Sequence, residues 1–286
     1  MKKLLYQFDT DTHPAVFDNV VAYDGGADHV TAYGGVTPAS VGALVDGAIF
    51  TRSPKDKKLT SIFVGGSNMA EGEALFKAVK KKFFAGFRVS VMLDSNGSNT
   101  TAAAGVAWLA HGRSLAGKRA VVLAGTGPVG QRVALMLARE GCQVALTSRS
   151  LARAEAATTA IHDRFEVDVE PLEAFDNAAR AQAIAGAQLV FATGAAGVHL
   201  LDEAAWVDAP RLELLADANA TPVLGISGID MSDKGRERHG KLVWGALGFG
   251  ALKIGLHRAC IGRMFEQNDL VLDGEEIYAI AKTMVG

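Results

Sequence analysis

Short β-rich runs alternate with helix-like runs along the first hundred residues, and this alternation predicts βα units built on a parallel sheet. The predicted strands are Lys3–Phe8, His29–Tyr33, Ser61–Val64 and Arg88–Leu93. The predicted helices begin near Pro14, Pro38 and Asn68. Asn68-Met-Ala-Glu71 supports the third helix, because it has a capping residue followed three positions later by an acid.

The same alternation continues after a polar segment, 94–101, that lacks any sizeable apolar side chain. An alanine-rich run from Ala102 to about His111 is compatible with a helix and is followed by glycines. The remaining predicted elements are strands Lys118–Ala124, Gln143–Ser148, Gln188–Ala192 and Leu212–Ala216, and helices Gln131–Glu140, Leu151–Phe165, Asn177–Ala185 and Gly274–Met284. The hydrophobic pattern therefore predicts an α/β protein.

Composition narrows the class of protein. The 286 residues are 49% hydrophobic and 21% charged, which is typical of a compact protein and not of a disordered chain. A formal net charge of -2 gives no electrostatic reason to expect nucleic acid or an anionic membrane as a partner. No apolar run approaches the roughly 20 residues that span a bilayer, and the N-terminus reads as a strand. Cys142 and Cys260 form no Cys-x-x-Cys pair, so we expect a reduced, cytoplasmic protein.

The segment Gly125-Thr-Gly-Pro-Val-Gly130 is the sharpest local signal, because a predicted strand precedes it and a predicted helix follows it. In a dinucleotide fold the first glycine allows the tight turn, the second lets the backbone approach a pyrophosphate, and the third permits close packing of helix on strand. The phosphates would lie at the helix N-terminus, where free N–H groups attract anions. The alternative is a tight βα turn without a ligand.

The end of the following strand bears on the choice of cofactor. NAD sites usually place an acid there for the ribose 2′-OH, whereas a 2′-phosphate needs donors and positive charge. This chain reads Thr147-Ser-Arg-Ser150 with Arg153 nearby and no acid before Glu155, which favours NADP. Alternatively, Arg149 simply begins a surface helix. Ala192-Thr-Gly-Ala-Ala-Gly197 would also reach the cofactor, or is a generic loop. The expected cofactor-binding residues are Gly125, Thr126, Gly127, Pro128, Val129, Gly130, Ser148, Arg149, Ser150, Arg153, Thr193 and Gly194.

The substrate side has a weaker signal. The seven histidines show no metal-ligand spacing, so no metal is predicted, and neither His-Glu-x-x-His nor Gly-x-Ser-x-Gly occurs. Lys253 and His257 are four apart after a glycine-rich stretch, so on a helix from Leu252 onward they would share one face. That face is either part of a site or a solvated helix surface. Tyr278 and Lys282 have a catalytic-looking spacing, but an exposed C-terminal helix would carry the same residues.

Taken together, these features resemble the NADP-dependent methylene-tetrahydromethanopterin dehydrogenases, which are related to the methylene-tetrahydrofolate dehydrogenases. The resemblance covers essentially the whole chain. It rests on the blocks Gln7-Phe-Asp-Thr-Asp11, Tyr23-Asp-Gly-Gly-Ala-Asp28, Phe63-Val-Gly-Gly66, Asp94-Ser-Asn-Gly-Ser-Asn-Thr-Thr-Ala-Ala-Ala-Gly105, Val121-Val-Leu-Ala-Gly-Thr-Gly-Pro-Val-Gly130 and Leu256-His-Arg-Ala-Cys260.

The resemblance implies two domains with a cleft between them. Residues 1–98 and 250–286 would form a substrate-binding α/β domain, and residues 99–249 a Rossmann NADP-binding domain. It also implies a homotrimer in which a neighbouring subunit helps to wall the cleft. The active-site positions carried over from the family are Phe17, Thr101, Lys253 and His257. Phe17 would pack against the pterin, although a core position on the first helix is the alternative. The other expected substrate-binding residues are Asp94, Ser95, Asn96, Ser98 and Thr100.

The implied reaction is dehydrogenation of N5,N10-methylene-tetrahydromethanopterin, and also of methylene-tetrahydrofolate, to the methenyl form. Nitrogen lone pairs assist loss of the hydride, so the protein's role is positioning and control of charge. Folate-type bifunctional relatives use a Tyr-x-x-x-Lys in the N-terminal domain for cyclohydrolase chemistry. No such pair occurs there, so dehydrogenation alone is expected. The alternatives are a non-catalytic NADP(H)-binding sensor and another Rossmann oxidoreductase.

Overall fold

The computed structural model describes residues 1–285, which fold around two separate sheets. Residues Met1–Thr100 and Ile254–Ile280 form one compact unit, unit 1. Residues Thr101–Lys253, with the segment from Ala281, form the other, unit 2. Among residues 1–285, no helix has both the length and the apolarity needed to cross a membrane.

Unit 1 contains a five-stranded sheet in the order β12-β4-β3-β1-β2, and every neighbouring pair is parallel. Its strands are β1 (Leu4–Asp9), β2 (His29–Tyr33), β3 (Thr60–Gly65), β4 (Ser90–Leu93) and β12 (Val271–Leu272). Its helices are α1 (Val16–Asp24), α2 (Gly42–Phe50), α3 (Met69–Lys81) and α9 (Gly274–Met284), with the 3-10 turns η1 (Pro54–Leu59) and η2 (Ser95–Gly97). The chain therefore builds this sheet from both of its ends.

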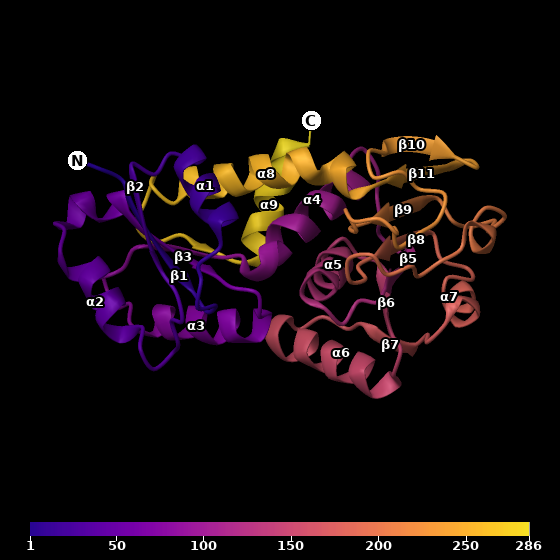
Figure 1. The fold of residues 1–286 in the computed structure, drawn as a ribbon, viewed down its shortest axis with the longest axis horizontal. Coiled ribbons are helices and arrows are strands. Elements are labelled where there is room, and N and C mark those ends of the chain that lie inside the picture. Colours follow the sequence, from indigo (N-terminus) through magenta and orange to yellow (C-terminus); the bar gives the residue numbers. More distant parts are fainter. Residues whose placement is uncertain (286) are drawn as a thin grey trace. The chain divides into compact units, whose positions relative to one another are not determined.

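Within unit 1, α2 and α3 lie on one side of the sheet and α1 on the other (Figure 1). Side chains along each strand point alternately to these two sides. Phe8 of β1 and Ile62 of β3 face α2 and α3, where they join an entirely apolar cluster with Val45 and Phe76. The opposite side of β1 and β3 carries polar residues such as Gln7 as well as apolar ones. Asn68 caps α3 by accepting hydrogen bonds from the N–H groups of Ala70 and Glu71, as the capping-box pattern predicts.

Unit 2 contains a seven-stranded sheet in the order β10-β11-β9-β8-β5-β6-β7, parallel except for the edge strand β10. Its strands are β5 (Arg119–Leu123), β6 (Gln143–Ser148), β7 (Glu170–Glu173), β8 (Leu189–Ala192), β9 (Leu214–Asp217), β10 (Lys234–Arg238) and β11 (Lys241–Trp244). Its helices are α5 (Pro128–Arg139), α6 (Leu151–Phe165) and α7 (Asn177–Ala183), with the 3-10 turn η3 (Glu203–Ala205). Three helices contain residues of both units: α4 (Ser98–Ala110), α8 (Ala246–Arg263) and α9, in which residues 281–284 belong to unit 2.

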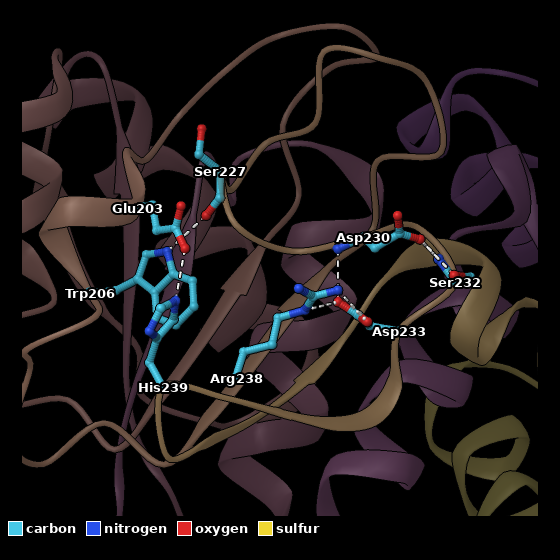
Figure 2. Close-up of polar contacts among 8 residues, drawn as sticks. All are labelled: Glu203, Trp206, Ser227, Asp230, Ser232, Asp233, Arg238 and His239. Carbon is cyan, nitrogen blue, oxygen red and sulfur yellow. Dashed lines mark hydrogen bonds and ion pairs between the residues drawn. The ribbon is translucent and has the colours of Figure 1, made fainter.

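Polar contacts fix the β10–β11 hairpin and the loops around it (Figure 2). The Arg238 guanidinium donates to both carboxylate oxygens of Asp233, at 2.6 and 2.9 Å, and one of these oxygens also accepts the N–H of Asp230 at 2.8 Å. At the hairpin turn His239 contacts Glu203, with 2.8 Å between Nε2 and Oε1, and packs edge-on against Trp206. These contacts anchor the antiparallel edge strand to the parallel sheet.

The predicted α/β class with parallel sheets is confirmed, but several boundaries are wrong. The strand expected from Arg88 begins at Ser90, and the strand expected from Leu212 begins at Leu214. The helix expected from Ala102 begins at Ser98, and the glycine-rich stretch before Leu252 is already helical from Ala246. β7, β10, β11 and β12 were not predicted, because they are short or carry charged residues instead of an apolar run.

Candidate functional site

The turn between β5 and α5 has the geometry that a dinucleotide fingerprint requires. A Cβ on Gly130 would overlap the Cα of Gly125, so helix and strand approach as closely as backbones allow. A Cβ on Gly125 would lie 2.7 Å from Cγ of Leu146 on the neighbouring strand. Gly127, in contrast, has open space beside it and precedes the first residue of α5, Pro128. Gly125 and Gly130 are therefore needed for packing, whereas Gly127 leaves room for a ligand at the helix N-terminus.

Side-chain hydrogen bonds hold this turn in place. The Thr147 hydroxyl accepts the N–H of Ala124, which has a φ of 53°. Gln131 of α5 donates to the carbonyl of Thr126 at 2.8 Å. Thr193, after β8, donates from Oγ1 to the carbonyl of Leu123 at 3.1 Å. The predicted cofactor segments at residues 125–130 and 193–194 therefore lie at the same sheet edge.

A pocket opens beside this turn at the end of β6. Its lining consists of Ala124, Thr126, Thr147, Ser148, Arg149, Arg153, Ala174, Arg180, Gly194, Ala195, Val198 and Leu200. Five of the predicted cofactor residues are thus in one pocket: Thr126, Ser148, Arg149, Arg153 and Gly194. Ser150 is the residue before α6. The pocket joins the glycine turn to a cluster of positive charge.

Arg180 of α7 also lines this pocket and was missed by the sequence analysis. It is buried, and its guanidinium donates to the carbonyls of Leu200 and Phe175 at 3.0 and 3.1 Å. Burial lowers the pKa of Arg180; Asp176 opposes this shift, and Arg149 adds to it. A buried guanidinium next to a second cation indicates a place for an anion. An arginine on a short polar helix gave no sequence signal of this role.

The polar segment 94–101, which belongs to unit 1 except for Thr101 in unit 2, is mainly helical and largely buried. Ser95–Gly97 is a 3-10 turn, and α4 begins at Ser98. The buried Asp94 carboxylate accepts the N–H groups of Asn99 and Thr100 at 2.8 and 3.1 Å, and the Thr100 hydroxyl at 2.6 Å. Asp94 therefore caps α4. Ser95 and Ser98 are buried too, whereas Asn96 is exposed with a φ of 56° and Thr101 is partly buried.

His257 is the centre of a buried cluster in the same unit. The imidazole is 0% exposed and stacks on Phe63, with 5.3 Å between ring centroids and 26° between planes. Its Nδ1 lies 3.9 Å from Oδ2 of Asp94. The possibility that His257 belongs to a solvated helix face is therefore wrong. Phe63 supplies the flat surface on which the His257 ring stacks. The sequence indicated no role for this residue.

Phe17 also contacts this cluster, with its ring centroid 6.3 Å from that of His257. It lies on α1 and is 47% exposed, so the alternative of a core position is wrong. Lys253 lies one helical turn before His257 on α8, as their spacing predicts. The structure brings Phe17, Asp94 and His257 together in unit 1. Within residues 1–285, no group of His, Cys, Asp and Glu side chains is arranged to hold a metal ion.

Comparisons with known proteins agree on one family. Residues 16–96 match the family described as methylene-tetrahydromethanopterin dehydrogenase, N-terminal. The bifunctional protein MdtA of Methylorubrum extorquens is 59% identical over 285 residues, which cover 99% of each chain. The NAD(P)-dependent methylenetetrahydromethanopterin dehydrogenase of the same organism is 32% identical, over 100% of this chain and 99% of the relative.

Two solved structures share the fold across the whole chain. A shikimate 5-dehydrogenase from Mycobacterium fortuitum has 17% identity and a TM-score of 0.50, with 97% of each chain covered. The quinate dehydrogenase of Corynebacterium glutamicum, in complex with NAD, has 15% identity and a TM-score of 0.50, with 99% of each covered. At these identities the likeness supports the Rossmann-like fold and no particular substrate.

Proposed function

Because this chain belongs to the methylene-tetrahydromethanopterin dehydrogenase family, we propose that it oxidises N5,N10-methylene-tetrahydromethanopterin to the methenyl form with NADP+ in one-carbon metabolism. Unit 2 would bind the dinucleotide and unit 1 the pterin. In terms of domains, we propose that residues 99–249 serve the cofactor and residues 1–98 with 250–286 serve the substrate.

The observation that carries the choice of NADP+ is the set of three arginines around one pocket. Arg149, Arg153 and Arg180 line it together with Ser148, which supplies a hydroxyl donor. A 2′-phosphate carries the negative charge that these groups match, whereas a bare ribose hydroxyl does not. The residues present therefore fit NADP+ better than NAD+.

The glycine turn would hold the pyrophosphate through backbone N–H groups at the start of α5. Thr126, Pro128 and Val129 lie in this turn, and Gly127 leaves the approach open. Gly194, after β8, lines the same pocket as Arg149 and would lie near the ribose that carries the 2′-phosphate, with Thr193 next to it in the chain. When bound, NADP+ supplies the hydride acceptor at C4 of the nicotinamide.

On the substrate side we propose that Phe17 forms the surface against which the pterin stacks, and that the buried His257 supports the Phe17 ring. Phe17 is 47% exposed, and its ring lies 6.3 Å from that of His257, which in turn stacks on Phe63. Thr101, Asn96 and the capped segment around Asp94 would border the pterin ring. Positioning is the main contribution that these residues make to rate, because the substrate nitrogens themselves stabilise the cation left by hydride loss.

Lys253 requires a separate account, because a positive charge beside a developing cation would raise the barrier. We propose that Lys253 binds the pterin carbonyl by a hydrogen bond, away from the reacting carbon. Lys253→Met then raises KM for the methylene-pterin. Unchanged kcat and KM would exclude a direct role for this residue.

The relative at 59% identity is named bifunctional. For this chain we propose one type of reaction on two substrates: it oxidises methylene-tetrahydrofolate as well as methylene-tetrahydromethanopterin. The unit 1 residues before Thr101 contain no Tyr-x-x-x-Lys, the pair that the related cyclohydrolases use, so a second reaction has no evident catalytic residues there. We also propose a cytoplasmic homotrimer, which sedimentation velocity of the purified protein would test.

A spectrophotometric assay tests the function directly. Methylene-tetrahydromethanopterin and methylene-tetrahydrofolate are each mixed with NADP+ or NAD+, and formation of the methenyl product and of reduced nucleotide is followed. We expect turnover with NADP+ and at least the first pterin. Tight NADP+ binding without turnover of either pterin would instead identify a sensor that binds the nucleotide.

A further inference from the structure

The loop between β1 and α1 is held by two fully buried polar side chains, Gln7 and Asp9, both 0% exposed. Asp9 Oδ2 accepts the backbone N–H of Ala15 at 3.0 Å. Gln7 Nε2 donates to the backbone carbonyl of the same Ala15 at 3.3 Å. Two strand side chains thus bind both backbone groups of the residue that precedes α1, an arrangement called the Ala15 clamp below.

We propose that Gln7 and Asp9 are positioning residues, which fix the start of α1 and thereby hold the Phe17 ring in register with His257. This inference rests on the proposed role of Phe17 in pterin binding. It assigns a purpose to the Gln7-Phe-Asp-Thr-Asp11 block, which neither the cofactor nor the substrate assignment uses.

The clamp acts at the N-terminus of α1, the end of the helix that carries Phe17. Ala15 has no side chain that could cap the helix, and no side-chain cap is present there. Phe17 follows two residues later and is 47% exposed. A buried ring is fixed by its neighbours on all sides, whereas a half-exposed ring depends on the backbone that carries it. The position of the Phe17 ring therefore depends on the backbone at Ala15 as well as on its contact with His257.

The two clamp side chains also orient each other. Gln7 Nε2 lies 3.4 Å from Asp9 Oδ2, so the amide nitrogen faces two acceptors, this carboxylate and the Ala15 carbonyl. The reverse amide orientation would place oxygen against oxygen. Asp9 Oδ1 in turn accepts the N–H of Asp11 at 2.9 Å. These contacts allow only one orientation of the Gln7 amide and of the Asp9 carboxylate, as positioning residues require.

Glycine at position 65 leaves the space that the clamp occupies. Gly65 pairs with Asp9 across β3 and β1. A Cβ there would lie 3.3 Å from Asp9 Oδ2 and 3.5 Å from Oδ2 of Asp18, in the first turn of α1. Beyond it, the Asp11 carboxylate accepts the N–H and the hydroxyl of Ser67. The loop is thereby tied to the end of β3, and the N–H of Gly35, after β2, donates to the carbonyl of Asp11 at 2.7 Å.

The test is a double-mutant cycle between Gln7→Met and Phe17→Ala, with kcat/KM for the methylene-pterin as the readout. Methionine keeps the length of the glutamine side chain but cannot donate to Ala15. We expect Gln7→Met to lower kcat/KM about tenfold in the wild-type background, because small misplacements of binding groups have effects of this order or larger. In the Phe17→Ala background we expect less than about a twofold further change, because the two residues act as one unit.

Ser61→Ala is the matched control. Ser61 is also 0% exposed and on a neighbouring strand, but its hydroxyl donates to the carbonyl of Met264 and not to the clamp. We expect its effect on kcat/KM to be the same with and without Phe17. A Gln7→Met effect that persists undiminished in the Phe17→Ala background would overturn the inference and indicate a general loss of structure.

Hydrogen exchange gives a readout that does not depend on turnover. Loss of the clamp should speed exchange of the amides at 15–19 in Gln7→Met, while Ser61→Ala leaves them unchanged. Unaltered exchange in Gln7→Met would contradict the clamp itself. If the wild-type protein oxidised neither pterin, the proposed function would fail, and exchange would still decide whether Gln7 holds α1.

Discussion

Replacing Arg149 with alanine should separate NADP+ from NAD+. Arg149 lines the pocket at the end of β6, but it is exposed, unlike Arg180. A hydrogen bond to a charged group contributes about 1.5–3 kcal/mol. Because solvent and salt screen an exposed guanidinium, the lower end applies, and about 1.4 kcal/mol corresponds to a tenfold weaker complex. NAD+ has no 2′-phosphate, so its affinity should change less than about twofold.

The assay is the dissociation constant of each nucleotide, measured by titration of the purified variant at low and moderate salt. Arg211→Ala is the control, because Arg211 is also exposed in unit 2 and is not among the residues that line the pocket. The loss for NADP+ should shrink as salt rises, since screening already weakens the wild-type contact. Equal losses for both nucleotides would refute the assignment of the phosphate to this pocket. Arg180→Met is a less clean choice, because it also removes the donors to Leu200 and Phe175.

Three further outcomes follow from the structure. Gly130→Ala should abolish binding of both nucleotides, because its Cβ would overlap Gly125 and displace the turn; isothermal titration checks this. Burial raises the pKa of Cys142 to about 11 and of Cys260 to about 12, so neither thiol should react with Ellman's reagent at neutral pH until the protein is unfolded. Asn68→Ala should cost about 1 kcal/mol in the free energy of unfolding, seen by denaturant titration, through loss of the α3 cap.

Much of the fold could be predicted because its determinants are local. The apolar run before Gly125 and the alternation of strands and helices both depend on neighbouring residues, and the Asn68 cap does too. β10 could not be predicted in this way, because its residues are mostly charged and it pairs through its backbone with β11. The early start of α4 at Ser98 depends on Asp94, whose carboxylate replaces water at the helix N-terminus.

The candidate site also contains residues that the local sequence predicts and residues that only tertiary packing brings together. The glycine turn and Arg149 are contiguous in sequence, so spacing alone points to them. Arg180 lines the pocket from α7, far along the chain from the glycine turn, and no local pattern encodes that arrangement. His257 had a clear spacing from Lys253, but its burial against Phe63 requires β3 and α8 to pack together. Contacts between distant segments are what the sequence pattern leaves open.

The two edge strands of the seven-stranded sheet, β10 and β7, affect the tendency of the protein to aggregate in concentrated solution. β10 has the sequence Lys-Gly-Arg-Glu-Arg, and β7 has Glu-Pro-Leu-Glu, in which Pro171 has no N–H to offer. An incoming strand would have to desolvate these charges or forgo a hydrogen bond. The edge strands β7 and β10 therefore disfavour pairing with strands of other molecules, which protects the protein from aggregation through this sheet.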